Sequence, residues 1–260
     1  MNGHVIRLGR LLWLSVWRSS VMWWSLRSFL ITLVVGQTVT PLLGLLVWMS
    51  ALNADRTVAT YYLVLLLVQL MTVSYEHHTV SNEIYEGTFD QTMVEPKPVV
   101  LSYLGQNLAM RFWHLTFGLP VVVVIAVIVG VRLELTAVLA AVPAIVLAGA
   151  LRFVFTYSLA LSALWTQRAH GAVGVGETLI FLLGGTAAPL SFLPEPFQSA
   201  GQLLPFWAML GMPAEIAAGT LQGGELFLAY ATQLGWLLLF TLLCTAIWRR
   251  GVRRFTFFGG

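Results

Sequence analysis

Charged residues are scarce in this 260-residue chain: they make up 10% of it, whereas hydrophobic residues make up 58%. A soluble domain carries about 25% charged residues. So few charges cannot cover the surface of a water-soluble globule, so the apolar surplus must face lipid. The single cysteine, Cys244, excludes a disulfide scaffold. We therefore expect an integral membrane protein.

Lysine is scarcer still: the chain has only Lys97. This residue lies between Pro96 and Pro98. A P-loop needs the pattern G-x-x-x-x-G-K-[ST], so the chain cannot bind ATP in that way. Membrane proteolysis is disfavoured as well, since the sequence has no G-x-S-x-G and its only aspartates, Asp55 and Asp90, fall in predicted loops on opposite sides. Any ATP must bind to another polypeptide.

A metal site is not expected at Glu76, His77 and His78, the one place where histidine and carboxylate crowd together. Adjacent histidines point to different faces of a helix, and the H-E-x-x-H spacing is missing. The sequence therefore predicts no metal on this chain.

Six apolar runs approach the roughly 20 residues that a helix needs to cross a bilayer. They are continuously apolar and lack the alternation of membrane barrel strands, which predicts an all-α fold. The predicted spans are Phe29–Ala51, Val58–Ser74, Phe112–Val131, Ala137–Leu164, Gly171–Leu190 and Leu226–Trp248. The whole chain, 1–260, is then one transmembrane domain, with spans one and two in 29–74, spans three to five in 99–190, and the sixth span in 226–248.

Arginine and lysine collect in alternate connections, which predicts the orientation by the positive-inside rule. This distribution at the ends of apolar runs, rather than in a stripe, also argues against nucleic acid as a partner. Both termini, including a tail at 249–260, are predicted to be cytoplasmic. The residues on the cytoplasmic side are Arg7, Arg10, Arg18, Arg27, Lys97, Arg111, Arg168, Arg249, Arg250, Arg253 and Arg254, and the opposite side has only Arg56 and Arg132.

The N-terminal segment 4–27 has the pattern of an amphipathic helix. Arg7, Arg10 and Arg18 fall within one arc, and an apolar group that includes Trp23 falls nearly opposite. We expect this helix to lie on the inner leaflet, with its arginines at anionic headgroups and its apolar face in the acyl boundary. The alternative is an anchor without a mechanical role.

The connection 191–224 is rich in proline and glycine but stays apolar in its middle. Its apolar stretches are too short to span, so one or two re-entrant or interfacial helices on the outer side are expected, with a loop on the bilayer surface as the alternative.

A compact acidic segment, 81–95, separates the second and third spans. It lies in a stretch, 75–98, that holds five of the chain's 11 carboxylates together with aromatic residues, and Pro96 and Pro98 end it. An acidic helix is not favoured against an anionic leaflet, so a protein partner is expected. The candidate contact residues are Glu83, Ile84, Tyr85, Glu86, Gly87, Phe89 and Asp90.

This segment, together with the tail Gly251–Gly260 and the order of spans, resembles the permease subunits of type-2 ABC exporters, and more narrowly their viologen-exporter-like branch. The resemblance implies that 81–95 is a coupling helix that docks on a separate ATPase. It further implies two ATPase chains carrying ATP and Mg²⁺, a second and different permease chain, a bacterial-type cytoplasmic (inner) membrane, and export by alternating access.

Two alternatives to that function stay open: a polysaccharide-type ABC export permease, and an ATP-independent channel or secondary carrier. The substrate is not specified by the sequence. Arg152 and Glu177 are charges within predicted spans, where an isolated charge costs about 2.5–3.5 kcal/mol. They are expected either to form a substrate-path or gating pair or to make a structural salt bridge.

Overall fold

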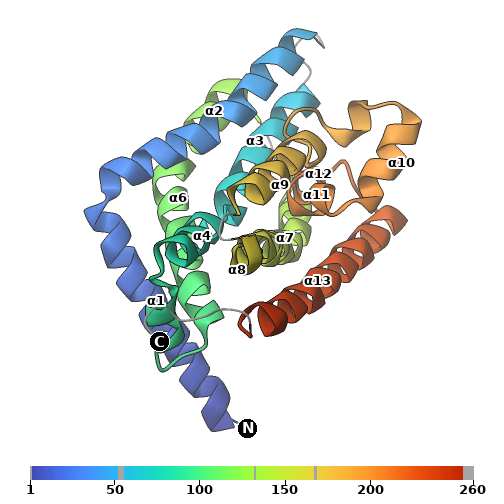
Figure 1. Cartoon of the computed structure of the whole chain (residues 1–260). Coiled ribbons are helices and arrows are strands. Elements are labelled where there is room, and N and C mark those ends of the chain that lie inside the picture. The colour runs from blue at the N-terminus through green and yellow to red at the C-terminus, as the bar shows by residue number, and fades with distance from the viewer. Residues whose placement is uncertain (1, 52–55, 132, 167–168, 254–260) are drawn as a thin grey trace.

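The computed structural model describes residues 2–51, 56–131, 133–166 and 169–253, and this part of the chain is helical with no strand (Figure 1). The predicted all-α fold is confirmed. Within these described residues, five helical stretches are long and apolar enough to cross a membrane: Arg27–Ala51, Arg56–Glu86, Val99–Val129, Leu135–Thr166 and Gly224–Gly251. Residues 254–260 of the predicted tail, with Arg254, lie outside the described part, as do Asp55, Arg132 and Arg168.

The helices follow one another with short connections. In chain order they are α1 (Asn2–Ser25), α2 (Arg27–Ala51), α3 (Arg56–Thr72), α4 (Glu76–Glu86), α5 (Phe89–Met93), α6 (Val99–Val129), α7 (Leu135–Leu161), α8 (Ala163–Thr166), α9 (His170–Leu183), the 3₁₀ turn η1 (Leu190–Phe192), α10 (Glu195–Leu203), α11 (Pro205–Met209), α12 (Gly211–Ala217) and α13 (Gly224–Gly251).

The centre of the bundle is α3, which packs against α2, α6, α7 and α12 (Figure 1). Nearly every residue of α3 is buried, from Val58 to Thr72. A helix that is apolar all round belongs in the interior. By contrast, α13 packs on α7 and exposes one long apolar side, including Leu238 and Leu242, which suits contact with lipid.

The predicted span Gly171–Leu190 is not one spanning helix. The structure has α9, which ends at Leu183 and has 14 residues. At 1.5 Å per residue it is about 21 Å long, against roughly 30 Å of hydrocarbon. The helix stops because Gly185 adopts a φ of 89°, and its carbonyl accepts a hydrogen bond from the Tyr61 hydroxyl at 3.0 Å. The apolar run therefore continues beyond the helix.

The connection after α9 folds into the turn η1 and the short helices α10, α11 and α12. Their predicted re-entrant or interfacial position on the outer side stays a prediction. All residues of α11 and α12 are buried. Gln233 of α13 donates to the carbonyls of Ala208 at 2.9 Å and Ala144 at 3.0 Å, which ties α11 to α7 and α13. In contrast, α10 exposes Phe197 and Leu203.

The N-terminal helix α1 packs along the first part of α6 and joins α2 at Leu26. Contact is close because Gly105 has no side chain: a Cβ there would come within 2.5 Å of the Ser15 Cβ. Trp23 differs from its prediction, since it is buried in a cluster with Leu30 and Met110 rather than placed at a lipid surface. The packing of Trp23 against Leu30 of α2 and Met110 of α6 determines this position, and its hydrophobicity alone does not.

Candidate coupling site and intramembrane polar cavity

The predicted coupling segment 81–95 is two helices rather than one. The first, α4, begins at Glu76 and ends at Glu86, where Gly87 takes the left-handed conformation with a φ of 72°. The N–H groups of Gly87 and Thr88 close on the Glu83 carbonyl, which turns the chain into the short α5. The predicted start at residue 81 was wrong, because α4 already starts at Glu76. It follows soon after α3, and no proline marks the break between the two helices.

One side of α4–α5 is fixed to the bundle. Ile84 and Phe89 are buried in an apolar cluster with residues of α6 and α7, including Tyr103 and Tyr157. The carboxylate of Glu83 accepts hydrogen bonds from the hydroxyls of Tyr103 and Thr92, the latter at 3.1 Å. These three predicted contact residues therefore face the protein's own interior, and they connect the segment to the long helices.

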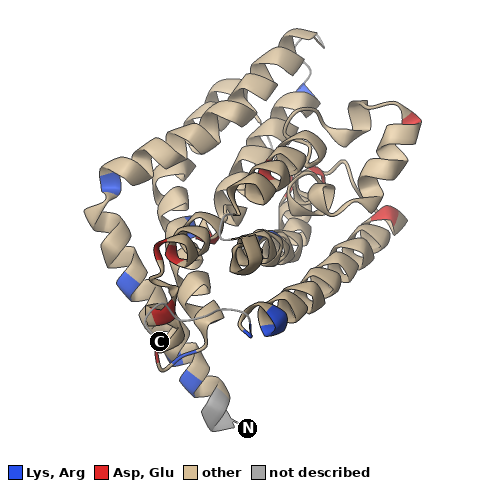
Figure 2. Cartoon of the chain, viewed as in Figure 1, with Lys and Arg blue, Asp and Glu red and all other residues tan. Residues whose placement is uncertain are grey.

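The other side of α4–α5 faces outward. Tyr85 is 55% exposed and Val94 is 77% exposed, and both Glu86 and Gln91 are exposed. Asp90 is partly buried. Figure 2 shows acidic residues gathered around α4 and the neighbouring turn. Basic residues, by contrast, lie along α1 and at the end of α13. The surface that remains for a partner is thus acidic, with an aromatic and an aliphatic side chain beside it.

The exit of this segment is tied to α1 through Glu95. Its carboxylate lies 3.5 Å from Arg18 and 3.2 Å from Lys97, and it accepts a hydrogen bond from Ser102 at 3.1 Å. Lys97 also donates to the Ser15 hydroxyl of α1 at 2.9 Å. Arg18, predicted to meet lipid headgroups, thus also contacts the coupling segment, whereas Arg7 and Arg10 are exposed.

Arg111 of α6 closes the break between α3 and α4, a role that sequence reasoning missed. Its guanidinium donates to the carbonyl of Val73 at 2.9 Å and to that of Gly149 in α7 at 2.8 Å, with a longer contact to Thr72 at 3.4 Å. A Cβ on Gly149 would lie 2.6 Å from this group. The signal was the polar pair Asn107 and Arg111, one helical turn apart in an apolar run.

The start of α4 is held by a second buried contact. The Glu76 carboxylate, which is 2% exposed, accepts hydrogen bonds from Asn107 of α6 and Thr156 of α7. The adjacent His77 and His78 rings lie against Tyr75, with centroids 6.1 and 4.8 Å away. These residues anchor the helix, and α4 is consequently joined to α6 and α7 at both of its ends.

Arg152 and Glu177 come together deeper in the bundle, with Arg152 Nη2 3.6 Å from Glu177 Oε2. They line a cavity of about 170 Å³ between α2, α3, α7 and α9. Gln69 and Gln37 join it, and the Gln69 amide donates to the Gln37 oxygen at 2.7 Å. Sequence reasoning identified the charges but not the glutamines, which look unremarkable in separate apolar runs.

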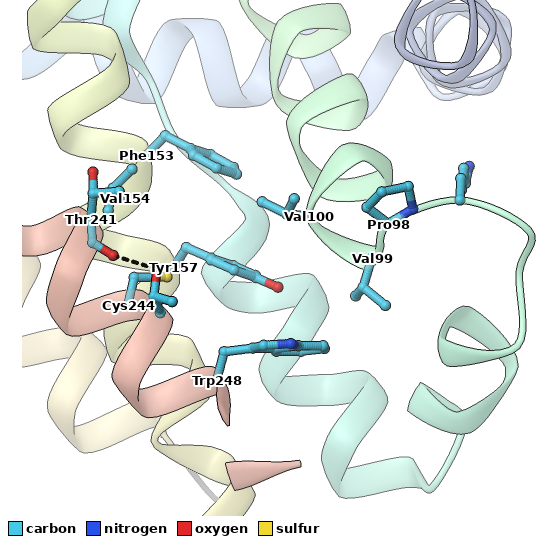
Figure 3. Close-up of a pocket in the computed structure, with 11 residues that line it drawn as sticks. Pro98, Val99, Val100, Phe153, Val154, Tyr157, Thr241, Cys244 and Trp248 are labelled. Carbon is cyan, nitrogen blue, oxygen red and sulfur yellow. Dashed lines mark hydrogen bonds between the residues drawn. The ribbon is translucent and has the colours of Figure 1, made fainter. Parts of the chain in front are cut away.

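A second cavity, of about 460 Å³, is apolar and lies between α6, α7 and α13. Phe153, Tyr157 and Trp248 point toward it from α7 and α13, and Val99 and Val100 close its other side (Figure 3). Cys244 of α13, which is partly buried, lines it as well.

The long apolar helices define a multi-pass membrane protein. The sequence contains no P-loop. Residues 24–259 match the family described as ABC-2 family transporter protein, and the chain belongs to that family. No curated protein and no solved structure matches it. The chain is therefore a transport subunit and not itself an enzyme, and membership of the family implies an ABC ATPase as partner.

Proposed function

We propose that this chain is the permease of an ABC exporter of the viologen-exporter-like branch, which moves a solute out of the cytoplasm by alternating access. The observation that carries this proposal is the two-sided α4–α5 segment. Ile84 and Phe89 fix it to the long helices, while Tyr85 and Glu86 on its other side are exposed. Such a segment can transmit the movement of a docked ATPase to the bundle.

Transmission follows from the contacts of α4. A push on its exposed side reaches α6 and α7 through Glu83 and Glu76, whose carboxylates are bound by side chains of those helices. It reaches α1 through Glu95 and Lys97. Packed interiors shift as bodies rather than deforming continuously, so a displacement at α4 moves several helices together.

The cytoplasmic side in this proposal is the end that carries α4. Basic residues support this orientation, since Arg249 and Arg250 lie in the last turn of α13 and Arg7, Arg10 and Arg18 lie on α1 (Figure 2). Both termini then face the cytoplasm across a bacterial-type inner membrane. The exposed acids Glu195 and Glu225 lie in the first turns of α10 and α13, at the opposite end (Figure 1).

A sixth crossing completes this topology. α9 begins at the α4 end, whereas α13 begins at the opposite end, so the chain from His170 to Gly224 has to cross once. We assign the crossing to α9 followed by the buried α11 and α12, which act as a re-entrant pair. Buried backbone at membrane depth is tolerated where protein surrounds it.

The working assembly should contain two permease chains and two ATPase chains, with ATP and Mg²⁺ bound only by the ATPase. The second permease is a different chain on the strength of the family resemblance. Native mass spectrometry of the protein, co-expressed with the ATPase and permease encoded beside it, tests this. A two-plus-two complex is expected; a lone monomer, or an assembly without ATPase, would contradict the proposal.

A further inference from the structure

The cavity at Arg152 and Glu177 contains buried polar atoms that find no hydrogen-bond partner within the described chain: Nε and Nη1 of Arg152, Oε1 of Glu177 and Oε1 of Gln69. Arg152 is 3% exposed. The 3.6 Å between its Nη2 and the Glu177 carboxylate exceeds the 2.7–2.9 Å of a charge-assisted hydrogen bond. Buried polar groups are as a rule hydrogen-bonded, so these donors and acceptors are available to a bound group.

The charges of the cavity balance. It holds one cationic and one anionic side chain, and the other polar groups that line it are neutral amides and hydroxyls: Gln37, Thr40, Gln69 and Thr186. An ion of either sign that entered would meet a like charge in surroundings of low dielectric constant, which is costly. A neutral group with both donors and acceptors meets no such penalty, because it can pair with Arg152 and Glu177 together.

Size and surroundings limit the ligand further. The cavity volume of about 170 Å³ corresponds to the liquid volume of roughly six waters, at about 30 Å³ each. Around it, α2 and α9 expose apolar side chains such as Val35, Val175 and Leu182. The space therefore suits a small polar group attached to an apolar or extended remainder, rather than a large solute enclosed on all sides.

We propose that this cavity binds an uncharged, hydroxyl- or amide-rich group of the transported solute, through Arg152, Glu177 and Gln69. The statement that the bound molecule is cargo rests on the proposed function; the binding itself does not. The inference excludes organic cations, organic anions and pure hydrocarbons as preferred ligands of this site.

Thiol labelling tests it on the full chain, in its native assembly and without ATP. Cys244→Ser removes the only cysteine, and Gly36→Cys then places one thiol at the cavity. A Cβ on Gly36 meets nothing within 4 Å, so the variant should fold. Gly235→Cys on α13 is the matched control, since its Cβ also meets open space and it lines none of the described cavities. The readout is the rate of reaction with N-ethylmaleimide.

Three probes share an octyl chain and are used below solubilising concentration: octyl glucoside, octyltrimethylammonium and octyl sulfate. Only the glucoside should slow the labelling of Gly36→Cys, and none should alter Gly235→Cys. Gln69→Leu should weaken the protection about fivefold, as expected for one lost hydrogen bond. Thr40→Val, at a half-buried position, repeats the test with a smaller risk to folding.

Equal protection by all three probes, no protection by the glucoside, or protection unchanged in both Gln69→Leu and Thr40→Val would overturn the inference. An unreactive thiol at Gly36→Cys would also overturn it, because the cavity would then be closed to water. Failure here with intact ATPase coupling removes only this ligand assignment. Protection by the glucoside without any ATPase partner would instead remove the exporter function and leave the binding site.

Discussion

Replacing Arg111 by methionine should destabilise the bundle strongly, because this side chain holds the break between α3 and α4. Its two short hydrogen bonds, to the carbonyls of Val73 at 2.9 Å and Gly149 at 2.8 Å, come from a charged donor. Such bonds contribute about 1.5–3 kcal/mol each, so the loss should be about 3–6 kcal/mol. Methionine preserves the length and apolar volume of the side chain, which isolates the contribution of the guanidinium.

The assay is thermal unfolding in a mild detergent, read by the fluorescence of the tryptophans. A loss of about 4 kcal/mol corresponds to a fall in Tm of roughly 10 °C for a chain of this size. Arg250→Met, at an exposed arginine in the last turn of α13, is the matched control and should stay within about 0.5 kcal/mol. Equal stability of the two variants would refute the role given to Arg111.

Two more predictions concern single contacts. Arg152→Leu alone should lower the free energy of unfolding by about 3 kcal/mol, because it leaves Glu177 unpaired. Adding Glu177→Leu should recover much of that loss. Strictly additive losses in a double-mutant cycle of Tm would contradict the pairing. Gly105→Ala should weaken the packing of α1 on α6 and so speed amide hydrogen exchange in α1. Gly9→Ala is the control, because a Cβ there meets nothing within 4 Å. Equal exchange rates of α1 in the two variants would refute the close packing at Gly105.

Helix positions follow closely from hydrophobicity, because lipid leaves the backbone few alternatives to helices. The predicted span Phe29–Ala51 starts two residues after α2 and ends at the same residue, and Leu226–Trp248 lies within α13, two and three residues short of its ends. Where a helix stops inside an apolar run is not encoded in hydropathy. α9 ends at Leu183 because Gly185 turns under the Tyr61 hydroxyl, and that contact joins residues 124 positions apart.

The candidate site was predictable in place but not in orientation. The acid content of 75–98 pointed to α4 and α5, yet only the packing separates the buried Ile84 and Phe89 from the exposed Tyr85 and Glu86. Arg111 illustrates a second limit. At the end of a predicted span an arginine indicates topology, and the same residue can also satisfy carbonyls of two neighbouring helices, which depends on tertiary contacts alone.

Reversing charge on the exposed side of α4–α5 tests most directly whether this surface couples the permease to an ATPase. Glu86→Lys with Asp90→Lys should reduce stimulation of the co-purified ATPase by about thirtyfold or more, since reversed charges at a desolvated interface cost about 2–5 kcal/mol. Glu195→Lys with Glu225→Lys makes the same change in charge at the opposite end, on exposed residues, and should leave stimulation intact. Unaltered stimulation in the first variant, with normal insertion and Tm, would contradict the coupling role of α4–α5.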